Sequence, residues 1–209
     1  MSGYFVTGTD TNVGKTVLSA LLVAALDAVY WKPIQTGAVE GTDRESVRAW
    51  TEACEERLPA ERYLFDPPVS PHLAAREAGV RIALEALKLP ETPSGRRWIV
   101  EGAGGVLVPI NERDLMRDLM RQTGFPAVIA ARTALGTINH TLLTVAALRQ
   151  TGIPICGVAM IGEENLENRR AIEAYGSVSV IGRIPILDKI NRAALLEVYE
   201  KHFDHRAFQ

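Results

Sequence analysis

The sequence is poor in several features that would place it in a specialised class of protein. Its 209 residues include only two cysteines, Cys54 and Cys156, which lie far apart in segments predicted as a helix and a buried strand. This argues against a disulfide framework and is typical of a reducing compartment, so we expect a cytoplasmic protein. The most apolar helix, residues 17–26, is too short to span a bilayer, and the first residues lack a secretion signal.

An excess of charge of one sign is also absent. The chain has 23 Lys and Arg against 25 Asp and Glu, which gives a net charge of −2 with no run of like charge. We therefore expect neither a nucleic acid nor a membrane as a partner. The composition, 47% hydrophobic and 23% charged, is that of an ordinary globular protein. The length predicts one α/β domain over residues 1–209.

Short apolar runs alternate with amphipathic stretches, which predicts a mostly parallel sheet of six or seven strands with helices on both faces. The predicted strands are residues 4–7, 28–31, 98–101, 127–131, 155–161 and 178–184. The predicted helices are residues 15–26, 43–54, 73–87, 115–122, 137–150, 166–175 and 192–203. Four prolines within residues 58–71 predict an irregular loop that can shape a site, and residues 202–209 are expected to fray.

The strongest functional signal is the string GTDTNVGKT, which begins at Gly8 after the first predicted strand and leads into a helix. A phosphate loop needs glycine where the backbone approaches phosphate, a lysine for the β- and γ-phosphates and a hydroxyl for magnesium. Gly14, Lys15 and Thr16 meet these needs. The motif is a variant, because Thr9 stands where its first glycine belongs. The string predicts a nucleoside triphosphate site.

Charged residues follow two other predicted strands, at the sheet edge where ligands of open α/β folds bind. Asp43 and Glu101 are expected on loops facing the phosphate loop, where with Thr16 they supply oxygen ligands for Mg²⁺. An alternative for Asp43 is the first turn of a helix, where acids are favoured by the helix dipole. Lys32 follows the second strand and places a second cation near the phosphates.

Six strings occur in order and together resemble the dethiobiotin synthetase family, whose fold is that of the P-loop NTPases. They are GTDTNVGKT, WKPIQTG, TD, SPH, VEGAGG and LGTINHTLLT. The resemblance implies a ligase of biotin biosynthesis that uses ATP and Mg²⁺. In that reaction 7,8-diaminononanoate takes up CO₂ as a carbamate, ATP phosphorylates the carbamate, and the second amine displaces phosphate to close the ureido ring of dethiobiotin. It also implies a homodimer with its active sites at the subunit interface.

The resemblance further assigns roles to individual residues. It implies that the catalytic residues are Lys15 and Lys32 and that the metal is held by Thr16, Asp43 and Glu101. The residues implied to bind the nucleotide are Asn12, Val13, Gly14, Lys15, Thr16, Val17, Asp43, Glu101, Gly102, Ala103, Gly104, Pro185, Ile186 and Leu187. The residues implied to bind the substrate are Thr11 and Thr36, together with Leu135, Gly136, Thr137, Ile138 and Asn139, which act from the partner subunit.

Two positions depart from the family pattern. Asn12 stands where relatives can carry an acidic residue. Met160, Ile161 and Gly162 stand where an asparagine can read adenine. Because Ile161 has no side-chain donor or acceptor, the selectivity for the base stays open.

The main alternative is a switch ATPase of the partition or cell-division type. Such proteins often carry a second lysine early in the phosphate loop, and residues 9–12 have none. A GTPase would need a base-reading N/T-K-x-D motif, which residues 188–191 do not supply. A synthetase of the cobyrinic acid type would need a glutaminase domain. Dependence of ATP turnover on the diamine and bicarbonate distinguishes the ligase from the switch.

Overall fold

The computed structural model describes residues 2–92 and 95–209. Its centre is a six-stranded sheet in the order β2-β5-β1-β6-β7-β8, in which every neighbouring pair is parallel. The strands are β1 (Gly3–Gly8), β2 (Val29–Trp31), β5 (Trp98–Gly105), β6 (Ala127–Arg132), β7 (Ile155–Ile161) and β8 (Val180–Ile184). Six strands and the parallel arrangement confirm the predicted fold class.

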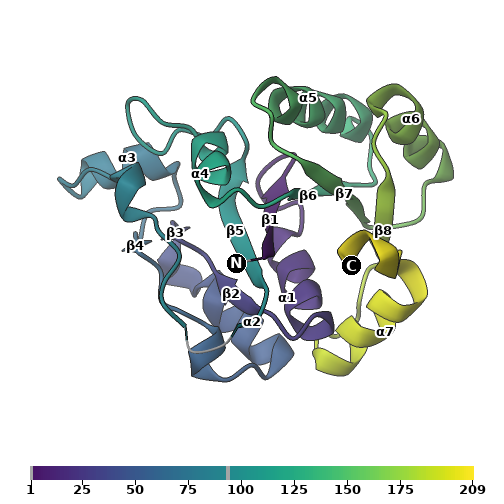
Figure 1. Ribbon diagram of the computed structural model, residues 1–209, viewed down its shortest axis with the longest axis horizontal. Coiled ribbons are helices and arrows are strands. Elements are labelled where there is room, and N and C mark those ends of the chain that lie inside the picture. Colours follow the sequence, from purple (N-terminus) through teal and green to yellow (C-terminus); the bar gives the residue numbers. More distant parts are fainter. Residues whose placement is uncertain (1, 93–94) are drawn as a thin grey trace.

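Helices cover both faces of this sheet (Figure 1). They are α1 (Lys15–Ala25), α2 (Asp43–Thr51), α3 (Pro71–Glu77), α4 (Met116–Thr123), α5 (Thr137–Gln150), α6 (Leu166–Gly176) and α7 (Arg192–His202). In Figure 1, α1, α2 and α7 lie below the sheet, and α4, α5 and α6 lie above it. None of the helices formed by the described residues is long and apolar enough to cross a membrane.

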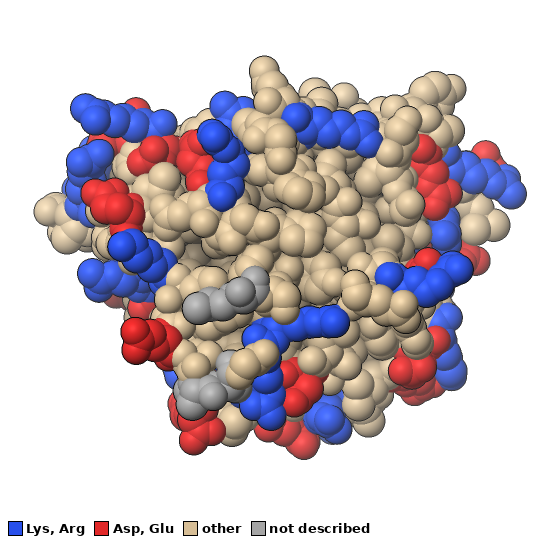
Figure 2. All heavy atoms as spheres, in the orientation of Figure 1, with Lys and Arg blue, Asp and Glu red and all other residues tan. Residues whose placement is uncertain are grey.

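The sheet separates two apolar cores, because successive side chains of a strand point to opposite faces. Phe5 belongs to one core and Val6, its neighbour in β1, to the other, and both are fully buried. Burial on both faces explains why the strands read as continuous apolar runs rather than alternating ones. On the face shown in Figure 2, charged side chains of both signs lie mostly around the rim, in keeping with the small net charge.

The predicted loop at residues 58–71 is wrong in part. It contains the two-residue strand β4 (Tyr63–Leu64), which pairs in parallel with β3 (Ile34–Gln35). A pair this short carries no periodicity that a sequence pattern can reveal. The segment begins at Leu58, the C-cap residue of the 3₁₀ helix η2 (Glu55–Arg57). The other 3₁₀ helices are η1 (Ala38–Glu40), η3 (Leu84–Ala86) and η4 (His205–Phe208).

The predicted helix at residues 73–87 is right only over residues 73–77 and wrong beyond them. Helix α3 ends at Glu77, and Gly79 then takes a left-handed conformation with φ +67°. The chain beyond it places Ile82 and Leu87 in the core from irregular backbone. Likewise, the helix predicted over residues 43–54 ends at Thr51, because Glu52 adopts φ +57°.

The C-terminal residues do not fray as expected. Phe208 is 2% exposed and lies edge-on to Tyr4, with ring centroids 5.3 Å apart. Arg97 donates a hydrogen bond to the Phe208 carbonyl, and the Cys156 thiol donates to the Ala207 carbonyl at 3.3 Å. Burial raises the pKa of Cys156 to about 11. The aromatic side chain near the end of the chain anchors this tail to the core.

Candidate functional site

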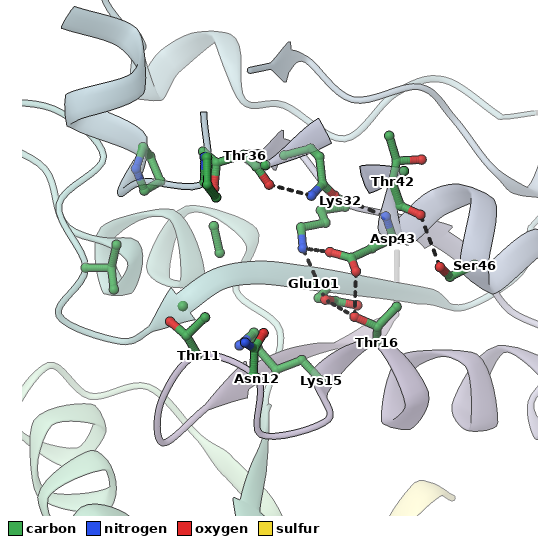
Figure 3. Close-up of a pocket in the computed structure, with 18 of the residues that line it drawn as sticks. Thr11, Asn12, Lys15, Thr16, Lys32, Thr36, Thr42, Asp43, Ser46 and Glu101 are labelled. Carbon is green, nitrogen blue, oxygen red and sulfur yellow. Dashed lines mark hydrogen bonds and ion pairs between the residues drawn. The ribbon is translucent and has the colours of Figure 1, made fainter. Parts of the chain in front are cut away.

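A cavity of about 800 Å³ lies at the carboxyl ends of β1, β2 and β5 (Figure 3). It lies between the loop that follows β1, helix α2 and the segment before α3. Its lining residues are Thr11, Asn12, Gly14, Lys15, Thr16, Val17, Lys32, Gln35, Thr36, Gly37, Gly41, Thr42, Asp43, Ser46, Trp50, Pro68, Val69, Ser70, Pro71, Glu101, Ala103, Gly104 and Val108. This is the sheet edge where the sequence predicts the site.

The loop between β1 and α1 presents a helix N-terminus to this cavity. Gly14 is the N-cap of α1 with φ +92°, and no side chain caps the helix there. A Cβ atom at this position would lie 2.7 Å from Ile161 Cδ1, so glycine is required. Asn12 is also left-handed, at φ +55°, a conformation that asparagine tolerates. The N–H groups at the start of α1 have no side-chain cap, and such groups suit an anion such as phosphate.

Lys15 lies beside these N–H groups and is 7% exposed. Its Nζ atom donates a hydrogen bond to the Asp10 carbonyl at 3.1 Å. Burial lowers the pKa of Lys15, opposed by the negative charge of Glu101. A cation that is already largely desolvated interacts strongly with an incoming phosphate.

Asp43 reaches the phosphate loop from the first turn of α2, and not from a loop as predicted from the sequence. Thr42 caps this helix by accepting a hydrogen bond from the Glu45 N–H at 3.1 Å. Asp43 Oδ1 accepts a hydrogen bond from Thr16 Oγ1 at 2.8 Å. The two interpretations of Asp43 therefore hold together: it is a first-turn acid and it faces the phosphate loop.

Glu101 lies inside strand β5, which continues to Gly105, and not at its end as predicted. Its side chain is fully buried, so its charge needs partners. Oε1 accepts hydrogen bonds from Thr16 Oγ1 at 3.2 Å and from Lys32 Nζ at 3.3 Å, and Oε2 accepts one from the Tyr30 hydroxyl at 3.1 Å. Burial raises the pKa of Tyr30 well above its ordinary value, which keeps the hydroxyl a donor.

Lys32 completes the cluster from the residue after β2 and is 6% exposed. Its Nζ atom forms ion pairs with both Asp43 and Glu101 (Figure 3). The structure thus brings Lys15, Thr16, Lys32, Asp43 and Glu101 together around one cavity, in agreement with the sequence prediction.

The oxygen atoms in this cluster fit a hard divalent cation. Thr16 Oγ1 lies within 3.2 Å of a carboxylate oxygen of both Asp43 and Glu101. Among residues 2–92 and 95–209, no group of three or more His, Cys, Asp or Glu is arranged as a metal site. Two carboxylates and a hydroxyl suit Mg²⁺, which takes its remaining ligands from phosphate oxygens and water.

The lining residues that were not predicted as site residues from the sequence include Gln35, Ser46 and Trp50. Gln35 is 6% exposed and accepts a hydrogen bond from the Asp43 N–H at 3.2 Å through its side-chain oxygen. Ser46 and Trp50 line the cavity from α2. They follow Asp43 by three and seven residues, so helical spacing from Asp43 would have identified them. No comparable signal points to Gln35.

Several expected site residues lie outside the cavity lining. Val13 is 2% exposed and packs in the core, and Gly102 lies against the Phe5 ring. Residues 185–187 directly follow β8, beside the end of β7. Residues 135–139 lie at the start of α5, and none of them lines the cavity of the same chain. Their roles toward nucleotide and substrate stay predictions.

Comparisons with known proteins agree with this geometry. Residues 2–194 match a protein family described as "AAA domain". Among solved structures, a ParA family ATPase from Chlorobium tepidum is similar with a TM-score of 0.58 and 13% identity, over 96% of this chain and 93% of that one. The cell division ATPase MinD from Pyrococcus furiosus gives a TM-score of 0.51 and 15% identity, over 96% and 98%. At these identities the likeness concerns the fold alone.

The curated relatives found by sequence share far more identical residues with this chain than these solved structures do. The ATP-dependent dethiobiotin synthetase BioD of Rhodopseudomonas palustris (strain BisB18) is 46% identical, over 97% of this chain and 96% of the relative. The enzyme of the same name from Paramagnetospirillum magneticum is 50% identical, over 93% of each chain. The chain belongs to the family of ATP-dependent dethiobiotin synthetases.

Proposed function

We propose that this chain is an ATP- and Mg²⁺-dependent ligase that closes the ureido ring of dethiobiotin. Its substrates are 7,8-diaminononanoate, CO₂ and ATP, and its other products are ADP and phosphate. The observation that carries the proposal is the convergence of Lys15, Lys32, Asp43 and Glu101 beside an uncapped helix N-terminus. We take residues 1–209 as one P-loop synthetase domain, and the cytoplasmic location stays a prediction.

In the proposed reaction, one amine of the substrate adds to CO₂ and loses a proton, giving a carbamate. A carbamate oxygen attacks the γ-phosphorus and ADP leaves. The second amine then attacks the carbonyl carbon and loses a proton, and phosphate leaves as the ring closes. The α1 N-terminus and Lys15 hold the β- and γ-phosphates. Thr16, Asp43 and Glu101 would hold Mg²⁺, which would supply further positive charge at the phosphate oxygens.

Lys32 is the cation nearest to both carboxylates, with which it is paired in this structure. Asp43 and Glu101 would hold a divalent cation at this place, which would supply them with the positive charge that Lys32 supplies here. Lys32 Nζ is then free to turn toward the carbamate and the transferred phosphoryl group, both of which are anionic. We therefore assign Lys32 to the reacting groups and Lys15 to the phosphates.

The metal set leads to a prediction on magnesium dependence. Asp43→Asn and Glu101→Gln should each raise the Mg²⁺ concentration needed for half-maximal turnover, since each removes an anionic ligand from a hard cation. The measurement is a Mg²⁺ titration of ADP formation at saturating ATP. Asp66→Asn, an exposed acid outside the cavity, serves as the matched control. A titration that overlays wild type removes that residue from the metal set.

We propose further that the enzyme acts as a homodimer, in which Leu135, Gly136, Thr137, Ile138 and Asn139 of the partner subunit hold the substrate carboxylate. Two observations on this chain support the proposal. Gly136 caps α5 with no side-chain hydrogen bond, so N–H groups at that helix end are available to a carboxylate. Leu135 is fully exposed and Leu143 is 61% exposed, which favours a covering partner.

A mixing experiment tests the shared site. Lys15→Ala and Asn139→Ala subunits, each inactive alone, should regain activity when mixed, because one of the two sites in a heterodimer receives both intact halves. With random exchange, about a quarter of all sites become active. Subunit exchange is verified with differently tagged chains. Verified exchange without recovered activity would show that the segment serves its own chain.

Base selectivity should be weak. Ile161 lies against Gly14 and is apolar, and Met160 is buried on the opposite face of β7. An apolar wall discriminates by only about 1–3 kcal/mol, so kcat/KM for ATP, CTP and GTP should agree within about two orders of magnitude. The alternative is that backbone groups of Pro185, Ile186 and Leu187 read the base. A preference for ATP above roughly 10⁴-fold would favour that alternative.

The direct test of the proposed function is an omission assay with the purified protein. ADP release should require the diamine, bicarbonate and Mg²⁺ together. ATP hydrolysis that is unaffected when the diamine or bicarbonate is left out would support the switch ATPase instead.

A further inference from the structure

The two oxygen atoms of the Glu101 carboxylate have different surroundings. Oε1 faces Thr16 and Lys32, at 3.2 and 3.3 Å, and so belongs to the cluster at the cavity. Oε2 accepts a hydrogen bond from the Tyr30 hydroxyl at 3.1 Å, and Tyr30 is its one hydrogen-bond donor among the residues that the structure describes. The carboxylate is therefore held at both oxygens, although only one of them faces the site.

Strand pairing explains how Tyr30 reaches Glu101. Strands β2 and β5 are parallel neighbours, and Tyr30 lies opposite Ile99. Glu101 follows Ile99 by two residues, so its side chain points to the same face of the sheet. Tyr30 and Glu101 are both 0% exposed, so the hydrogen bond between them lies in the protein interior.

We infer that Tyr30 is a positioning residue whose hydroxyl fixes the Glu101 carboxylate so that Oε1 is directed to Thr16 and to a bound divalent cation. This inference rests on the proposed metal set. A buried carboxylate with one free oxygen can rotate about its terminal bond, whereas a donor on Oε2 restricts it to one orientation. Groups that orient a metal ligand in this way typically contribute 10- to 100-fold to metal affinity.

The test variant is Tyr30→Phe, which removes the hydroxyl and keeps the ring that fills the core. Tyr4→Phe is the matched control. Tyr4 is a buried tyrosine in the same core as Tyr30, but it lies near the start of β1, whereas the cavity lies at the carboxyl end of that strand. The readout is the binding of Mn²⁺, a paramagnetic probe for the Mg²⁺ site, to protein with a non-hydrolysable ATP analogue. Free Mn²⁺ is followed by electron paramagnetic resonance.

We expect the Mn²⁺ dissociation constant of Tyr30→Phe to rise by about 10- to 100-fold, while that of Tyr4→Phe stays at the wild-type value. Binding of the nucleotide analogue in EDTA should be unchanged in both. Thermal unfolding in EDTA separates positioning from packing: a fall in melting temperature with unaltered Mn²⁺ affinity would overturn the inference.

Glu101→Gln separates this inference from the proposed function. If Tyr30 acts through Glu101, the double variant Tyr30→Phe/Glu101→Gln should bind Mn²⁺ no more weakly than Glu101→Gln alone. Additive losses would contradict a role through Glu101. If Glu101→Gln keeps the wild-type Mn²⁺ affinity, the proposed metal set is refuted. If Glu101→Gln binds Mn²⁺ more weakly but Tyr30→Phe does not, only the role of Tyr30 is refuted.

Discussion

Lys15→Ala is expected to reduce turnover by at least about 10³-fold, to the limit of detection, while the protein stays folded. Lys15 is 7% exposed, and its ammonium group contacts the Asp10 carbonyl beside the uncapped start of α1. Because this group meets phosphate charge in a largely desolvated site, its loss removes an electrostatic contact that water cannot replace. ADP formation and far-ultraviolet circular dichroism are the two measurements.

Lys88→Ala is the control for this change, because Lys88 is an exposed lysine outside the cavity. It should retain the wild-type rate. A Lys15→Ala enzyme with a rate near that of wild type would rule out the phosphate-loop assignment.

The second large effect is expected for Lys32→Ala, whose kcat should fall by about 10²-fold or more with nucleotide binding retained. Lys32 contacts the carboxylates of Asp43 and Glu101 and not the phosphate loop itself. Its removal leaves the Glu101 charge buried without its cation, so the variant should unfold at a lower temperature in EDTA. Mg²⁺ should restore much of that stability, since the metal takes the place of the ammonium group.

The quantities that decide this prediction are kcat, the affinity for ATP and the Mg²⁺ requirement. Unlike the carboxylate variants, Lys32→Ala should not raise the Mg²⁺ concentration for half-maximal turnover, because its two carboxylates are left intact. Weaker ATP binding with an unchanged kcat would assign Lys32 to the nucleotide.

The parts of the site that could be predicted from the sequence are those with a fixed place along the chain. Lys15 and Thr16 begin a helix directly after a strand, and Glu101 interrupts an apolar run before three glycines. Parallel strands bring their carboxyl ends to one edge, so these residues were expected to meet, and they do. The capping box of Thr42 and Glu45 was also readable, because its spacing is short.

The parts that could not be predicted depend on contacts between distant segments. Tyr30 reads as an ordinary strand residue until the β2–β5 register places it near Glu101. The helix expected over residues 73–87 has helical spacing, yet Gly79 ends it and Ile82 is buried from irregular backbone. The C-terminal residues were expected to fray because chain ends are usually poorly ordered. Phe208 instead packs on Tyr4, a residue near the other end of the sequence.

Incorporation of labelled carbon into dethiobiotin tests the ligase reaction itself. The purified protein is incubated with 7,8-diaminononanoate, ¹³C-labelled bicarbonate, ATP and Mg²⁺, and the products are analysed by mass spectrometry alongside ADP release. We expect dethiobiotin that carries the label at the ureido carbon, formed in a one-to-one ratio with ADP, and formed about 10²-fold or more slowly by the Lys32→Ala protein. ADP release without labelled dethiobiotin would contradict the proposed function.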